Sequence, residues 1–86
     1  RFVMLYFWSP DCIICRNVEK FLKEIEKHYN MLIVAINVQD GLNISQQFYV
    51  KSLPTFVFLK KSVVKARIEG FRGENNMEKE IRNLIL

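Results

Sequence analysis

The amino-acid sequence predicts an α/β protein whose single mixed sheet of four strands has helices on both faces. Apolar runs of strand length alternate with segments whose apolar residues recur every three or four positions. The first two strands are separated by enough residues for a crossover helix, which makes them parallel, whereas the last two are joined too closely for a crossover. Eighty-six residues leave room for one core, so we expect a single domain over residues 1–86.

The first half of the chain predicts a strand, a helix and a second strand. Residues 2–8 are apolar and rich in aromatic side chains, as in a strand buried on both faces. From residue 12 to about residue 29, the apolar positions follow one face of a helix. They are Ile14, Val18, Phe21, Leu22, Ile25 and Tyr29. Asn30 belongs to a residue type that ends helices, and residues 31–38 form a second buried strand.

The second half predicts a short helix and then two strands. Ile44 and Phe48 indicate a helix over residues 45–50. Residues 55–59 form a third apolar strand. Apolar and charged residues alternate from Val64 onwards, which predicts a half-exposed fourth strand antiparallel to the third.

A last helix is expected at the C-terminal end of the sequence. Asn75 or Asn76 would cap it, and Asn75 with Glu78 approximates a capping box. Its buried face would carry Met77, Ile81, Leu84 and Ile85. The predicted element order is therefore β-α-β-α-β-β-α.

Composition and charge favour a soluble domain. The net charge is +4, and most basic residues are dispersed. One basic group lies near the expected hairpin and could favour acidic partners: Lys60, Lys61, Lys65 and Arg67. No nucleic-acid motif accompanies it, and no apolar run reaches the roughly 18 residues that span a bilayer. We expect no nucleic acid and no membrane as partners. The start of the chain does not resemble a signal peptide, so we expect a cytoplasmic location, or an extracytoplasmic one if a signal segment has been removed.

The only two cysteines, Cys12 and Cys15, lie where the first strand gives way to the first helix. Two cysteines are too few for a disulfide-rich scaffold. At a helix start, unpaired N–H groups and the helix dipole favour the thiolate of Cys12. Cys15 follows about one turn later, so the two sulfurs can form a disulfide. We predict that the more exposed Cys12 attacks a substrate disulfide and that Cys15 resolves the mixed disulfide.

Two other uses of the cysteines are weighed against redox chemistry. They could be inert packing residues, because free cysteine is often buried. They could also form half of a zinc site shared between two chains, since zinc needs four ligands. His28 cannot join them within one chain, because it lies roughly 20 Å further along the helix axis. We expect no metal and no cofactor besides the cysteine pair.

The segment from Phe7 to Arg16 resembles the active-site segment of the thioredoxin family, Phe-Trp-Ala-Pro-Trp-Cys-Gly-Pro-Cys-Lys/Arg. Leu53-Pro54-Thr55 is similar to the family's Ile-Pro-Thr, and Gly70 falls where the family has a glycine after its last strand. The resemblance implies a thioredoxin-like three-layer α/β/α sandwich. It also implies a thiol–disulfide oxidoreductase that acts on protein disulfides and is served by an upstream reductase or electron donor.

The resemblance assigns substrate binding to Trp8, Leu53, Pro54 and Gly70. It implies that the Leu53–Pro54 peptide bond is cis, so that the backbone N–H and C=O of Leu53 hold substrate as an extra strand beside the cysteines. From the residues alone, an ordinary trans proline that opens an edge strand is an equal alternative.

Four residues around the cysteines depart from the family pattern and are expected to tune the redox reaction. Ile13 and Ile14 replace Gly-Pro and should hinder approach to the sulfurs. Asp11 replaces Trp, and its carboxylate should oppose a thiolate on Cys12, unless it serves as a helix cap. Tyr6 replaces a buried acid and is a poor base near pH 7. Of these, Asp11 favours, weakly, a reductase over a strong oxidant, because its carboxylate should destabilise the Cys12 thiolate.

The family also has a strand and a helix before the strand that begins this sequence. Without them, the strand over residues 31–38 becomes an apolar sheet edge that invites pairing. We expect another segment, chain or domain to cover it, so that the sequence is one module of a larger protein. The alternative function is a thioredoxin-like module that captures extended peptide at Leu53-Pro54 with little turnover.

Overall fold

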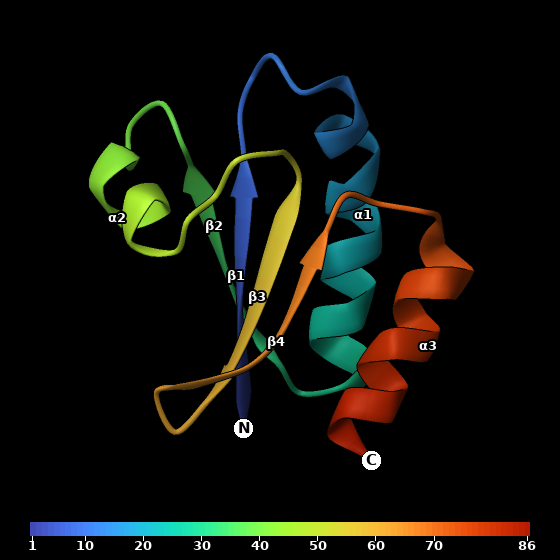
Figure 1. Cartoon of the computed structure of the whole chain (residues 1–86). Helices are drawn as coiled ribbons and strands as arrows, with labels where there is room; N and C mark the ends of the chain where they lie inside the picture. The colour runs from blue at the N-terminus through green and yellow to red at the C-terminus, as the bar shows by residue number, and fades with distance from the viewer.

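The computed structural model describes all 86 residues and shows four strands and three helices in the predicted order (Figure 1). The elements are β1 (Phe2–Trp8), α1 (Ile13–His28), β2 (Leu32–Asn37), α2 (Leu42–Gln47), β3 (Thr55–Lys60), β4 (Val63–Glu69) and α3 (Glu74–Ile85). The predicted α/β architecture with one mixed sheet is confirmed.

The sheet has the strand order β2-β1-β3-β4. β1 is parallel to β2 and antiparallel to β3, and β3 is antiparallel to β4. Helices α1 and α3 cover one face of the sheet and α2 covers the other (Figure 1). Both termini lie at one end of the sheet, and the connection from β1 to α1 lies at the opposite end (Figure 1).

The main core lies between the sheet and the α1–α3 layer. Central β1 and β3 contribute alternate side chains to it, including Met4, Tyr6, Phe56 and Phe58. The ring of Phe7 instead faces α2, where its centroid lies 6.0 Å from that of Phe48. Strand β1 is therefore covered on both faces, as its unbroken apolar sequence predicts.

The buried face of α1 differs from the predicted one at its first turn. Ile14 was expected in the core, but 49% of it is exposed, whereas Cys15 is buried. The helix begins at Ile13, and Cys15, Val18, Leu22 and Ile25 form one continuous stripe. Ile14 lies on the same side of the helix as the buried Phe21 and Ile25, so its exposure follows from its place in the first turn of α1 and not from its position around the helix axis. Asn30 does end the helix, because it takes a left-handed conformation with φ 50° immediately after the C-cap.

The bounds of the two later helices were predicted incorrectly. Helix α2 begins at Leu42 rather than residue 45, and the chain leaves it at Tyr49 with a left-handed φ of 54°. Helix α3 begins at Glu74 with Gly73 as its N-cap, so neither Asn75 nor Asn76 caps it. Gly73 has φ +104°, a conformation that favours glycine, and it starts the helix two residues before the expected cap.

Strand β2 is a sheet edge, as expected, but it is not a buried strand. Leu32 and Val34 are 41% and 40% exposed. The edge also has a polar partner that its own sequence does not reveal, because the backbone N–H of Ile33 donates to Oε2 of Glu26 on α1 at 3.3 Å. None of the three helices combines the length and the apolar character that a bilayer-spanning helix requires.

Candidate active site

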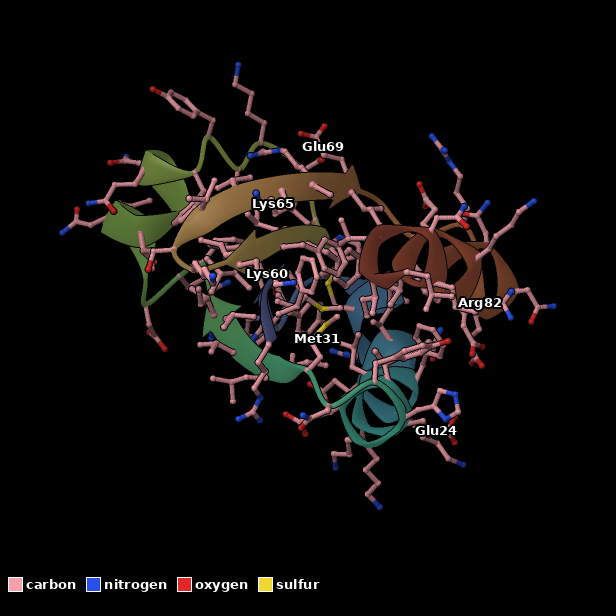
Figure 2. The ribbon with its side chains drawn as sticks, turned by 90° about the horizontal axis from the view of Figure 1, so that it is seen from below. Glu24, Met31, Lys60, Lys65, Glu69 and Arg82 are labelled. Carbon is pink, nitrogen blue, oxygen red and sulfur yellow. A yellow bond between two sulfur atoms is a disulfide. The ribbon has the colours of Figure 1, made fainter.

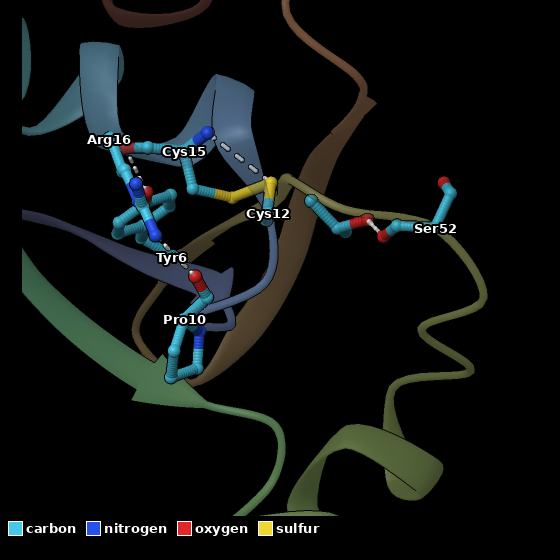
Figure 3. Close-up of a disulfide and its surroundings, with 7 residues drawn as sticks. Tyr6, Pro10, Cys12, Cys15, Arg16 and Ser52 are labelled. Carbon is cyan, nitrogen blue, oxygen red and sulfur yellow. Dashed lines mark hydrogen bonds between the residues drawn. A yellow bond between two sulfur atoms is a disulfide. The ribbon is translucent and has the colours of Figure 1, made fainter.

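Cys12 and Cys15 form a disulfide at the first turn of α1, with their Cα atoms 5.3 Å apart (Figure 3). Cys12 is the N-cap residue and has an extended backbone. Its Sγ accepts a hydrogen bond from the backbone N–H of Cys15 at 3.2 Å. Its own N–H donates to the carbonyl of Ser9 at 3.1 Å, which closes the turn after β1. The N-cap position and the hydrogen bond from the Cys15 N–H both favour negative charge on the Cys12 sulfur.

The two sulfurs differ in access to solvent. Cys15 is 3% exposed and belongs to the core between the sheet and α1. Cys12 is partly exposed and lies at the edge of that core. A substrate can therefore approach Cys12 from solvent, whereas Cys15 is within reach of little except Cys12. This is the difference in exposure that the sequence predicted for the two cysteines.

The Leu53–Pro54 segment lies beside the disulfide because of the strand register. Thr55 pairs with Phe7, so the residues before β3 and those after β1 meet at the same end of the sheet. The Leu53–Pro54 peptide bond is cis, as the resemblance implies. Figure 1 shows the connection between α2 and β3 at the same end of the sheet as the connection between β1 and α1.

Two hydrogen bonds hold the Leu53–Pro54 segment in place. The backbone N–H of Gly70 donates to the Pro54 carbonyl at 2.8 Å, and the hydroxyl of Thr55 donates to the Ser52 carbonyl at 2.7 Å. Gly70 has φ +84°, which a residue with a side chain adopts at a cost. Gly70 thus holds Pro54 through its backbone N–H, although it offers no side chain to a substrate.

Tyr6 lies beneath the cysteine pair. Its hydroxyl donates to the backbone carbonyl of Cys15 at 3.0 Å (Figure 3). Burial, and secondarily the charge of Glu19, raises the pKa of Tyr6 to about 12. Tyr6 is therefore a neutral hydrogen-bond donor at physiological pH and does not act as a base.

The remaining predicted residues lie on the exposed rim of the site. Asp11 does not cap α1, because Cys12 occupies that position. Its Oδ2 accepts from Nε2 of Gln39, in the turn after β2, at 3.0 Å. Ile13 is 75% exposed next to Cys12, and Trp8 packs half-buried against the core. The Gln39 contact leaves no local signal in the sequence, since 28 positions separate Gln39 from Asp11.

His28 lies in the last turn of α1, far from the cysteines along the helix. The structure brings no group of three or more His, Cys, Asp or Glu side chains together in a metal-ligating arrangement. The candidate site comprises the disulfide, the Leu53–Pro54 segment and the side chains around them.

A mixed α/β sheet with a Cys-x-x-Cys disulfide at the start of its crossover helix, beside a cis proline, defines the thioredoxin-like class of proteins. Comparison with known families agrees: the family model Thioredoxin matches residues 1–83, so this chain belongs to the thioredoxin family.

Individual relatives are similar over most of this chain. Thioredoxin 2 of Plasmodium berghei is 28% identical over 81 residues, which cover 92% of this chain and 52% of that protein. The chloroplastic M-type thioredoxin of Spinacia oleracea is 30% identical over 85 residues, which cover 96% of this chain and 47% of that protein. The chain thus spans about half the length of these relatives.

The solved structure of Deadhead, a germline-specific thioredoxin of Drosophila melanogaster, superposes with a TM-score of 0.90. It is 24% identical, and the match covers 98% of this chain and 81% of that one. At this identity the likeness shows the fold alone.

Proposed function

We propose that this domain is a thiol–disulfide oxidoreductase that exchanges disulfides with protein substrates through Cys12. The observation that carries the proposal is the Cys12–Cys15 disulfide at the N-terminus of α1, with one sulfur accessible and the other buried. Membership of the thioredoxin family supports it.

The reaction begins with the reduced pair. The Cys12 thiolate attacks one sulfur of a substrate disulfide, forming a bond to that sulfur and releasing the other as a thiolate that takes up a proton. Cys15 then loses its proton and attacks the Cys12 sulfur. The mixed disulfide breaks, and the second substrate thiol leaves. Two electrons pass from the cysteine pair to the substrate, and an upstream dithiol reductant must supply them again.

The first step is assisted by groups that surround the Cys12 sulfur. The backbone N–H of Cys15 points at it, and the sulfur occupies the N-cap position of α1. Both interactions stabilise an anionic sulfur more than a neutral thiol. Tyr6 is not the base for Cys15, because its hydroxyl is neutral at physiological pH and already donates to the Cys15 carbonyl.

Leu53 supplies the place for a substrate backbone. Neither its N–H nor its C=O has a hydrogen-bond partner within the chain, whereas the carbonyl of the next residue, Pro54, is taken by Gly70. An extended substrate segment can pair with these two free groups as an added strand. This pairing would bring the substrate disulfide alongside Cys12.

We favour reduction as the direction of the reaction. Asp11 adjoins Cys12, and a carboxylate there disfavours the thiolate. A strong oxidant needs a very stable reduced thiolate. The structure thus supports a reductase more than an oxidase.

A disulfide reduction assay with insulin and dithiothreitol tests the proposal. The native chain should accelerate insulin reduction, and Cys12→Ser should abolish the acceleration while leaving the fold intact by circular dichroism. If the two proteins behave alike, the proposed activity is wrong.

The second candidate is a peptide-binding module with little turnover. The free backbone groups of Leu53 and the exposed side chains of Ile13 and Ile14 favour it, because they can contact a peptide without any redox step. It predicts that the double variant Cys12→Ser, Cys15→Ser binds extended peptides as tightly as the native chain in calorimetry. Loss of binding in the double variant would count against it.

A further inference from the structure

Arg67 on β4 reaches across to the C-terminal end of α2 with all of its guanidinium nitrogens engaged. Nη1 donates to the carbonyl of Phe48, and Nη2 donates to the carbonyl of Tyr49 at 2.8 Å. Nε donates to Oε2 of Glu69, two residues along the same strand, at 2.8 Å. The side chain of Arg67 is 29% exposed, so its guanidinium group and the hydrogen bonds it makes are partly shielded from water.

The two carbonyls are groups that need a donor. Phe48 is the C-cap of α2, where the last carbonyls of a helix lack partners within the helix and carry its negative dipole end. Tyr49 follows with φ 54°, an uncommon conformation for a residue other than glycine or asparagine. A planar guanidinium can bond both carbonyls at once, which a lysine ammonium cannot do with the same geometry.

This contact fixes one end of the segment that leads to the active site. Only residues 50–52 separate Tyr49 from Leu53, the residue with free backbone groups beside Cys12. The other end of the segment is already held, because Thr55 belongs to β3 and its hydroxyl bonds Ser52. The α2–β3 connection, residues 48–54, is therefore anchored at both ends, and Arg67 provides the anchor on the α2 side.

We infer that Arg67 is a positioning residue for substrate: it holds the α2–β3 connection so that Leu53 presents its backbone beside Cys12. The inference rests on the proposed function and goes beyond it by assigning a role to a charged residue outside the cysteine motif. Arg67 itself touches neither sulfur. Its effect should therefore fall on substrates that need backbone pairing and spare those that need only a reactive sulfur.

Arg67→Gln and Lys65→Gln test this role as a matched pair. Lys65 lies two residues earlier on β4, at the outer edge of the sheet (Figure 2), and carries the same charge. It takes part in none of the hydrogen bonds or ion pairs described above, so its replacement removes a charge without removing the anchor. Each variant is assayed on insulin and on a small disulfide, bis(2-hydroxyethyl) disulfide, which has no backbone to pair.

Arg67→Gln should raise the KM for insulin about tenfold, in line with the loss of hydrogen bonds from a charged donor, with kcat and the small-disulfide rate unchanged. Arg67→Lys should recover only part of the loss, and Lys65→Gln should match the native chain. Amide exchange gives a readout independent of turnover: the amides of Tyr49 and Val50 should exchange about tenfold faster in Arg67→Gln, with those of α1 unchanged.

Each outcome decides between the alternatives. A native chain without activity on insulin overturns the proposed function itself, whatever the variants do. An active native chain with an equally active Arg67→Gln overturns the positioning role alone. Equal losses on insulin and on the small disulfide, or faster exchange throughout the chain, would show a general structural role and also overturn it.

Discussion

The phenol of Tyr6 and the peptide carbonyl of Cys15 are joined by a buried hydrogen bond of 3.0 Å. The bond ties central strand β1 to the first turn of α1 directly beneath the disulfide (Figure 3). It places a neutral hydrogen-bond donor next to Cys15. Tyr6 therefore supports the structure without taking part in the redox reaction, and substitutions can test both statements.

Tyr6→Phe should lower the free energy of unfolding by about 1 kcal/mol, because it leaves the buried Cys15 carbonyl without its donor. It should leave the pH profile of insulin reduction unchanged, since Tyr6 carries no proton that the reaction uses. Urea unfolding and pH–rate measurements on the two proteins check both statements. A shift in the profile would show that Tyr6 does take part in proton transfer.

Stability should fall at high pH because of the same residue. The pKa of Tyr6 is raised from 10.0 to about 12 in the folded chain, chiefly by burial. Its stabilising contribution is therefore fully present below pH 10 and lost as the pH rises towards 12. Two pH units correspond to about 2.7 kcal/mol as an upper figure.

The alkaline loss is measured as the difference between the native chain and Tyr6→Phe in urea unfolding at pH 9.5 and 11.5, which cancels the titration of the lysines. Tyr29→Phe is the matched control. Tyr29 also has a raised pKa, from burial and its bond to Glu78, but it lies outside the cysteine site. An identical pH dependence in the native chain and Tyr6→Phe would refute the assignment.

The unequal burial of the two cysteines predicts opposite behaviour of their serine variants. Cys15→Ser should accumulate a stable mixed disulfide with substrate, because Cys12 still attacks but nothing resolves the adduct. Cys12→Ser should accumulate none, since the remaining thiol is 3% exposed. Intact mass spectrometry after incubation with insulin distinguishes them. Comparable adducts on both variants would contradict the assigned roles.

Asp11→Asn should make Cys12 more reactive in the reduced chain. The substitution removes a negative charge near the sulfur and retains an oxygen that can accept from Gln39. The rate of alkylation by iodoacetamide at pH 7 should rise on the order of threefold. Asp40→Asn, which removes an equal charge from the turn after β2, should leave the rate unchanged. A slower Asp11→Asn variant would mean that Asp11 does not oppose the thiolate.

Gly70→Ala and Gly73→Ala separate backbone strain from substrate binding. Both glycines have positive φ, and a Cβ would meet no atom within 4 Å at either, so each variant should lose about 1 kcal/mol of stability from strain alone. Only Gly70 bonds Pro54, so only its variant should also raise the KM for insulin. Unfolding curves and steady-state kinetics check the pair, and equal KM values would remove Gly70 from the site.

Much of the fold was predictable because local patterns and long-range packing agree. The unbroken apolar run of β1 indicated a central strand, and the short link before β4 indicated an antiparallel pair. The helix bounds were less predictable, since Gly73 rather than Asn75 begins α3 and Tyr49 ends α2 through a left-handed turn. Those positions depend on where the tertiary structure redirects the chain.

The sequence by itself determined the chemistry of the site. The spacing of Cys12 and Cys15 places both sulfurs within one helical turn, a local property that needs no distant contact. Only the tertiary structure decided what surrounds them. The contacts of Asp11 with Gln39, of Tyr6 with Cys15 and of Arg67 with Tyr49 join residues 28, 9 and 18 positions apart. Such partners are set by strand order and helix packing, which no local pattern encodes.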